Sequence, residues 1–154
     1  MSTPFETHAT AQHALAALHD ALAGLEHRCI ELTAAALRFA VDDVTTLTAG
    51  LDDDTAVLAD RHAAAATALA AARAEGLDLS LLSPSRDEVV AYARRVHDVQ
   101  QDTRAILERA RSFTGAHARA LVGGPPPAVG YTRRAMAATS SLSSIAGALQ
   151  TARV

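Results

Sequence analysis

Residues 11–39 read AQHALAALHDALAGLEHRCIELTAAALRF, and the apolar side chains in this stretch recur at alternating steps of four and three residues. Such spacing places one apolar stripe along an α-helix, as in coiled coils, where the stripe faces a neighbouring helix. We therefore expect a long first helix from about residue 7 to residue 49. Its stripe comprises Ala11, Leu15, Leu18, Leu22, Leu25, Cys29, Leu32, Ala36 and Phe39.

Gly50 interrupts this pattern, and three aspartates follow at positions 52–54. Carboxylates can accept hydrogen bonds from the free amides of a helix start, so we interpret them as caps of a second helix. A calcium loop is a poorer interpretation, because the central glycine and the distal glutamate are missing. The second helix should end near Glu75, before Gly76. Alternatively, Gly50 only kinks one continuous helix over residues 7–75.

A second repeat with the same rhythm occupies residues 89–120 and predicts a third helix over about residues 86–121. Ser85 and Glu88 have the spacing of a capping box, in which each side chain bonds the other's backbone amide. Residues 77–83 then form the connector. The stripe of this helix comprises Val89, Tyr92, Val96, Val99, Thr103, Ile106, Ala110, Phe113, His117 and Ala120.

Two glycines and three prolines at positions 123–127 end the third helix and favour an extended linker over residues 123–131. Residues 132–152 carry a weaker helical pattern, with Met136, Leu142, Ile145 and Leu149 able to lie on one side. We therefore predict an all-α fold: an antiparallel bundle or coiled-coil-like hairpin of three long helices with a short C-terminal helix. The expected parts are the bundle domain at 1–122, the linker at 123–131 and the helical tail at 132–154.

The composition narrows the function classes. The 154 residues carry a net charge of −3, and only 3% of them are aromatic. The arginines are dispersed and few rings could stack on bases, which argues against nucleic-acid binding. No segment has 18 uninterrupted apolar residues, and the N-terminus lacks a basic start followed by an apolar run. With a single cysteine, Cys29, these features predict a cytoplasmic protein without a membrane span.

Residue spacing also gives little support to catalysis. None of the seven histidines has an acidic residue three positions before it, and no His-x-x-x-His pair exists. His27 and Glu31 alone would supply only two metal ligands. Cys29 lies in an apolar stripe, where burial is expected to raise the pKa of its thiol. We therefore expect no metal, no cofactor and no enzymatic activity, which leaves binding through helix surfaces.

Two interpretations of the apolar stripes remain open. Stripes wider than the intramolecular bundle can cover would form a groove for a partner's helix. Alternatively, all stripes are buried within the chain or in a homodimer, as in a structural, self-associating coiled-coil protein.

The order of features resembles the FlgN-type flagellar export chaperones over about residues 8–135. The resemblance lies in Gly-Leu-Glu-His-Arg at 24–28, Glu-Gly-Leu at 75–77, Ser-Pro-Ser at 83–85 and Gly-Tyr at 130–131. It implies a cytoplasmic helical chaperone that binds the C-terminal helical region of hook-filament junction proteins before export. By this resemblance the partner-binding residues would be Val96, Val99, Ile106 and Phe113 in the third helix, and Tyr131, Met136, Leu142 and Ile145 in the tail. The third-helix residues could equally belong to the intramolecular core.

Overall fold

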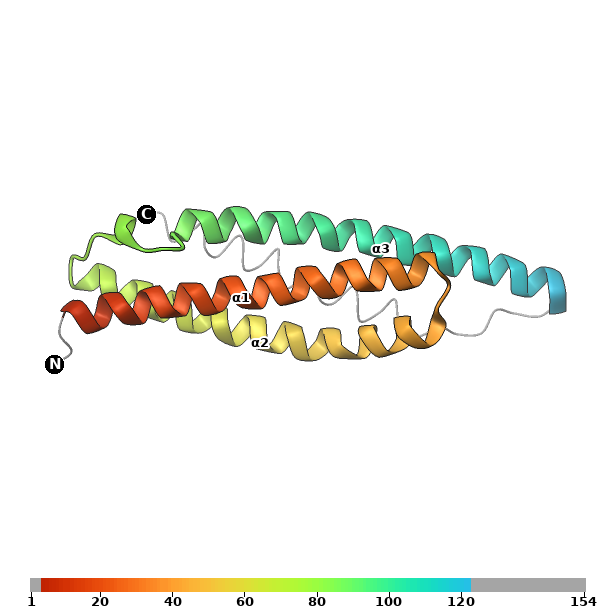
Figure 1. Cartoon of the computed structure of the whole chain (residues 1–154), viewed down its shortest axis with the longest axis horizontal. Coiled ribbons are helices and arrows are strands. Elements are labelled where there is room, and N and C mark those ends of the chain that lie inside the picture. Colours follow the sequence, from red (N-terminus) through yellow and green to blue (C-terminus); the bar gives the residue numbers. More distant parts are fainter. Residues whose placement is uncertain (1–3, 123–154) are drawn as a thin grey trace.

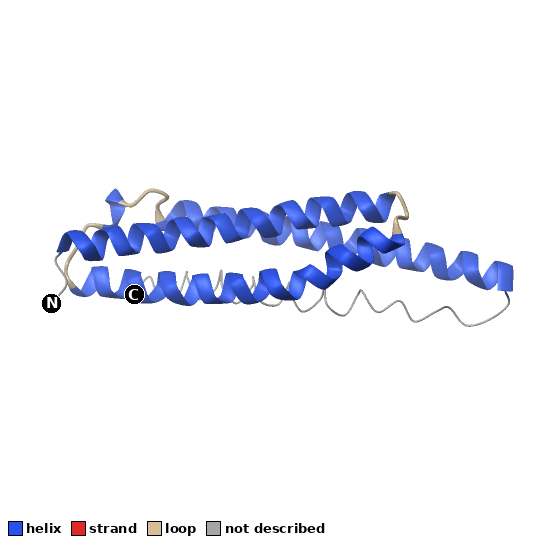
Figure 2. Cartoon of the chain, turned by 60° about the horizontal axis from the view of Figure 1, so that its bottom comes forward, coloured by secondary structure: helices blue, strands red, loops and turns tan. Residues whose placement is uncertain are grey.

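The computed structural model describes residues 4–122, which form three long α-helices and one short 3-10 helix (Figure 1). The elements are α1 (Pro4–Leu37), α2 (Val41–Ala74), η1 (Leu79–Leu81) and α3 (Arg86–Val122). No β-strand occurs within this described part, so the predicted all-α class is confirmed (Figure 2). The predicted linker, the C-terminal helix and the tail domain at 123–154 lie outside the described residues.

The helix α1 occupies the centre of the fold. It pairs with the antiparallel α2 on one side and with α3, which runs parallel to it, on the other (Figure 1). In contrast, α2 and α3 hardly approach each other. One helix therefore buries a broad surface against two neighbours, which explains why the apolar stripe of α1 is the strongest signal in the sequence.

The core follows the predicted stripes closely. In α1, the leucines at 15, 18, 22 and 32 are fully buried, and in α3 both Val89 and Val96 are fully buried. Burying one such side chain contributes about 1.5–3 kcal/mol. The stripe of α2 ends in small residues, with Ala65 and Ala72 almost fully buried. Small side chains allow close approach of the helices, because little volume separates the two backbones.

The turn between α1 and α2 lies at residues 38–40, so both predictions for Gly50 were wrong. Gly50 lies inside α2, and the aspartates at 52–54 neither cap nor begin a helix. Asp54 instead pairs with Arg28 of α1. The early turn gives α1 and α2 the same length of 34 residues, so their apolar stripes lie against each other over the whole hairpin.

Both helices of the hairpin end in the same backbone motif. After α2, the amide of Gly76 donates to the carbonyl of Arg73, and the amide of Leu77 donates to that of Ala72. After α1, Phe39 donates to Ala36 at 3.1 Å, and Ala40 donates to Ala35 at 3.0 Å. This is the Schellman pattern, which places one residue in the left-handed region. Gly76 occupies that position with a φ of 71°, and Phe39 does so with a φ of 55°.

The predicted capping box at the start of α3 is confirmed. The amide of Ser85 donates to Oε2 of Glu88 at 2.6 Å, and the amide of Glu88 donates to Oγ of Ser85 at 3.2 Å. Two backbone donors at the helix start are thereby satisfied. The bond from Ser85 also lowers the pKa of the Glu88 carboxyl.

Candidate functional site

The helix α3 continues past the turn that joins α1 to α2 (Figure 2). Its stripe of Val99, Ile106 and Phe113, spaced by seven residues, lies along one edge of the helix. Val99 and Ile106 are partly buried against the core, whereas Phe113 is 62% exposed and Leu121 is 72% exposed. The apolar stripe therefore outlasts the helix that covers it.

The exposed end of this stripe meets apolar side chains from the turn. The rings of Phe39 and Phe113 have centroids 5.6 Å apart, and the ring of His117 stacks on Phe113 at 6.2 Å. Leu37 and Val41, on either side of the turn, are also more than half exposed. We call Leu37, Phe39, Val41, Phe113 and Leu121 the apolar tip. Exposed apolar side chains that gather from two elements are typical of a protein-binding surface.

Phe39 holds its place in the apolar tip at an energetic cost. A side chain other than glycine in the left-handed region costs about 1–2 kcal/mol, because its Cβ crowds the following carbonyl oxygen. At the equivalent position after α2 the chain uses Gly76, which adopts this conformation freely. The ring of Phe39 is nevertheless 55% exposed, so burial in the core does not account for its presence.

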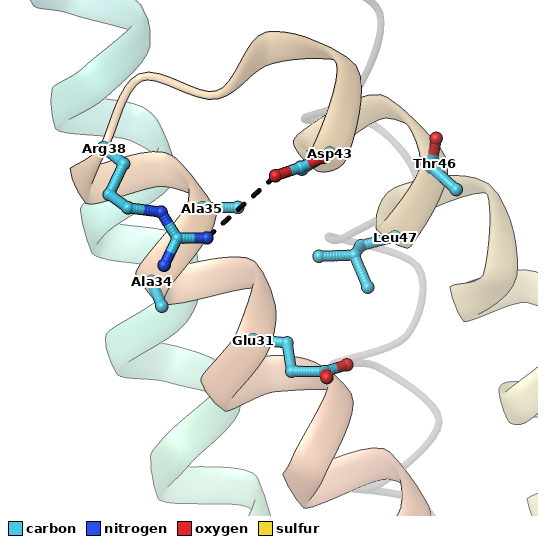
Figure 3. Close-up of a pocket in the computed structure, with 7 residues that line it drawn as sticks. All are labelled: Glu31, Ala34, Ala35, Arg38, Asp43, Thr46 and Leu47. Atoms are coloured by element: carbon cyan, nitrogen blue, oxygen red, sulfur yellow. Dashed lines mark ion pairs between the residues drawn. The ribbon is translucent and has the colours of Figure 1, made fainter.

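An open cleft lies beside the apolar tip, between the end of α1 and the start of α2 (Figure 3). Its floor includes Ala35 and Leu47, and an ion pair of Arg38 with Asp43, at 4.0 Å, closes one end. The Glu31 carboxylate, which also lies 3.3 Å from Nε2 of His27, borders the opposite side. The cleft therefore combines an apolar floor with charged rims, a combination that suits a polypeptide side chain.

A polar junction joins α1 to α3 nearer the start of α3. The Tyr92 hydroxyl donates to the Glu26 carboxylate at 2.6 Å, and Arg95 donates to the same group at 3.2 and 3.3 Å. The tyrosine bond and the arginine hold the pKa of Glu26 below its usual range. His19 stacks on Tyr92 at 4.6 Å, and the Arg95 guanidinium lies 4.4 Å from the ring centre. These groups satisfy one another, so the junction is best understood as a helix clamp.

A second clamp joins α1 to α2. The Arg28 guanidinium donates through Nε and Nη2 to the two carboxylate oxygens of Asp54, with the Nη2 bond at 3.2 Å. Both side chains are about 30% exposed, and the bond to Asp54 raises the pKa of Arg28. Such two-point geometry fixes the lateral position of one helix on the other.

Cys29 is unsuited to nucleophilic chemistry in this environment. It is 3% exposed, and burial raises the pKa of its thiol to about 11. The predicted burial of this residue and the raised pKa are therefore confirmed. Within residues 4–122 no cluster of three or more potential metal ligands occurs. In that part of the chain, no helix has the length and apolar character needed to span a membrane.

The structure separates the predicted partner-binding residues. Val96 is fully buried in the core, and Val99 and Ile106 pack against the core with partial exposure. Only Phe113 lies on an exposed surface. The four tail residues proposed with them, Tyr131, Met136, Leu142 and Ile145, lie outside the described residues.

Sequence reasoning missed the contribution of the turn. Phe39 has the correct spacing for the α1 stripe, so the pattern placed it within the helix. The one local signal was the pair Asp42 and Asp43, whose carboxylates lie in the first turn of α2 and favour a helix start there. Leu37 and Leu121 gave no signal of exposure, because exposure depends on where the neighbouring helices end.

Comparisons with known proteins assign no family. No protein-family model matches the chain, and searches of curated proteins and of solved structures also give no match. The fold itself defines the class: an all-α hairpin bundle of long helices with a helix end that extends beyond the bundle.

Proposed function

We propose that the chain is a helical chaperone of the FlgN type, which binds the C-terminal helical region of flagellar hook-filament junction proteins before their export. The observation that carries the proposal is the apolar tip, where the stripe of α3 continues beyond the end of α1. An amphipathic helix of a partner could extend the packing that α1 provides lower down, with its apolar residues at three- and four-residue steps. The resemblance of the sequence to FlgN-type chaperones suggests the class of partner.

The size of the surface favours reversible binding. The apolar tip offers only a few large side chains, and a disordered partner loses conformational entropy when it folds on this surface. Moderate affinity follows, because much of the energy of apolar burial is offset by this ordering. A chaperone that must release its client before export requires such a balance.

Titration calorimetry with the full chain and C-terminal fragments of hook-filament junction proteins tests the proposal. We expect one-to-one binding with a dissociation constant near or below about 10 µM. Phe113→Asp should weaken binding at least about tenfold, because it places a charge at the centre of the interface. Val57→Asp is the matched control, since Val57 is 48% exposed in the middle of α2 and away from the turn. Absence of binding at tens of micromolar, roughly −6 kcal/mol, would overturn the proposal.

Self-association of the apolar tip is the competing function. Sedimentation of the full chain separates the two, because a chaperone awaiting its client should sediment as a monomer. A stable dimer that Phe113→Asp dissociates, together with absent client binding, would instead assign the apolar tip to a contact between two copies.

A further inference from the structure

The flanks of α2 and α3 that face each other are buried although these two helices hardly approach each other. On α3, Tyr92 contacts Glu26 of α1, and each following residue lies about 100° further around the helix. Ala93 and Gln100 therefore lie on the edge next to the one that contacts α1, and they are 1% and 4% exposed. We define the α2–α3 face by Thr55, His62 and Leu69 on α2 and by Ala93, Gln100 and Leu107 on α3.

The residues of α2 on this face show the same partial withdrawal from solvent. Thr55, His62 and Leu69 are spaced by seven residues and so share one edge of the helix. Leu69 is buried, and the other two are half-buried. Burial also lowers the pKa of His62. The face is therefore continuous along α2 and α3, and it is wide enough to leave the two backbones apart.

Two polar atoms on the α3 side indicate that another segment completes this face. Oε1 of Gln100 and Nδ1 of His97, one turn away, are buried without a hydrogen-bond partner in the described part of the chain. Buried polar groups in folded proteins almost always have a partner. A segment that supplies hydroxyl or amide donors opposite Gln100 would satisfy that requirement.

The sequence after Val122 has the length, charge and pattern to fill this position. Residues 123–154 contain no acidic residue and three arginines, whereas α2 contains six aspartates and two arginines. Arg133 and Arg134 directly follow the linker, and α3 ends at the same end of the molecule as the α2 start with its Asp42 and Asp43 (Figure 1). Opposite charges are thereby available where the chain would turn back.

The side-chain pattern of this segment matches the face as well. Leu142, Ile145 and Leu149 are spaced by three and four residues, which gives a helix one apolar edge. Four serines at 140, 141, 143 and 144 lie beside that edge and offer hydroxyl donors. The nine-residue linker spans about 25 Å when extended, which exceeds the roughly 14 Å by which α3 continues beyond Phe113.

We propose that residues 132–149 form a fourth helix that packs into the α2–α3 face, opposite α1 and antiparallel to α3. This intramolecular contact is distinct from the apolar tip, and it does not depend on the identity of any client. The fold is then a four-helix arrangement in which α1 and the C-terminal segment both lie between α2 and α3, on opposite sides.

Photo-crosslinking of the full chain without any partner tests this placement. Benzoylphenylalanine at position 145 should crosslink within the same molecule to peptides that contain Thr55, His62 or Gln100. The matched control has the photo-crosslinker at position 140, on the opposite side of the segment, and should give little product with these peptides. A mixture of isotopically light and heavy protein identifies crosslinks between copies. Products only between copies, only on other surfaces, or none at all would overturn the proposal.

The native cysteine gives a second readout in the same full chain. Cys29 belongs to the stripe of α1 that points between α2 and α3, so removal of the fourth helix should expose it. Leu142→Asp with Ile145→Asp should raise the rate of Cys29 alkylation at least about tenfold while the helical circular dichroism of α1–α3 is retained. Ser140→Asp with Ser144→Asp adds the same charge on the other side and should leave the rate unchanged. An unchanged rate in the first variant would contradict the proposal, and if that variant loses its helices the crosslinks decide.

Discussion

The two ends of α3 have the same sequence rhythm but different surroundings. Up to Ile106, the stripe packs against α1, with Val89 and Val96 fully buried. From Phe113 onwards, the same spacing continues with side chains more than half exposed, because α1 has already ended at Leu37. The difference teaches that a three-four pattern specifies a face but not its neighbour. The length of the adjacent helix decides whether that face becomes core or binding surface.

The largest expected difference between these regions is in stability. Leu22→Ala, in the fully buried part of the α1 stripe, should lower the free energy of unfolding by about 2–5 kcal/mol, because it removes apolar contacts and leaves a cavity. Leu121→Ala at the exposed end should change it by less than about 0.5 kcal/mol. Urea denaturation of both variants measures this. Equal losses would show that the end of α3 is as tightly packed as its start.

The turn that exposes the apolar tip offers a sharper comparison. Phe39→Gly and Phe39→Ala both remove the ring, but only glycine relieves the left-handed backbone. We expect the glycine variant to be the more stable one by about 1 kcal/mol. Both variants should bind a client helix less tightly than the unmodified chain does. If alanine is equally stable, the backbone at residue 39 is not strained in solution, and the argument that Phe39 is present for binding loses its energetic basis.

The sequence was sufficient for the helices and their buried faces but not for the place where the first helix ends. At residue 76 a glycine marks the left-handed position, so that helix end was predictable. At residue 39 a phenylalanine adopts the same conformation, and no local rule predicts a chain reversal there. Gly50 and the three aspartates that follow it are stronger local signals, yet packing of the two stripes overrides them. The site was correspondingly hard to predict: Phe113 was found from spacing, whereas the contribution of the turn required the position of the reversal.

Two glycines inside helices extend the comparison at a smaller scale. Gly24 lies at an exposed position of α1, and a methyl group added there would meet no other atom within 4 Å, so Gly24→Ala should stabilise the chain by about 0.5–1 kcal/mol. At Gly50 a Cβ would lie 2.6 Å from Nη1 of Arg28, so alanine there must displace the clamp with Asp54. We expect a smaller gain or a loss for Gly50→Ala. The full gain should return in the Arg28→Ala background, which a double-mutant cycle of thermal melts can measure.

The smallest expected effect is a pH dependence at the α1–α3 junction, which lies in the well-packed region. The pKa of Glu26 is lowered in the folded state, first by the Tyr92 hydroxyl and then by Arg95. The folded protein therefore binds the Glu26 proton more weakly than the unfolded chain does. The resulting stabilisation is present above the ordinary pKa of 4.5 and is lost as the pH falls through the lower, folded value.

Glu26→Gln isolates this contribution, because glutamine keeps an acceptor for Tyr92 but carries no charge. The unmodified chain should be the more stable of the two at pH 7, and the difference should shrink as the pH falls below about 4.5. Arg95 is mostly exposed, so solvent screens its share, and added salt should reduce that share further. A difference that stays constant from pH 7 to pH 3 would mean that the carboxylate charge does not hold α3 to α1. Packing of Val89 and Val96 would then fix the start of α3 alone, and the contrast with its exposed end would be one of apolar burial only.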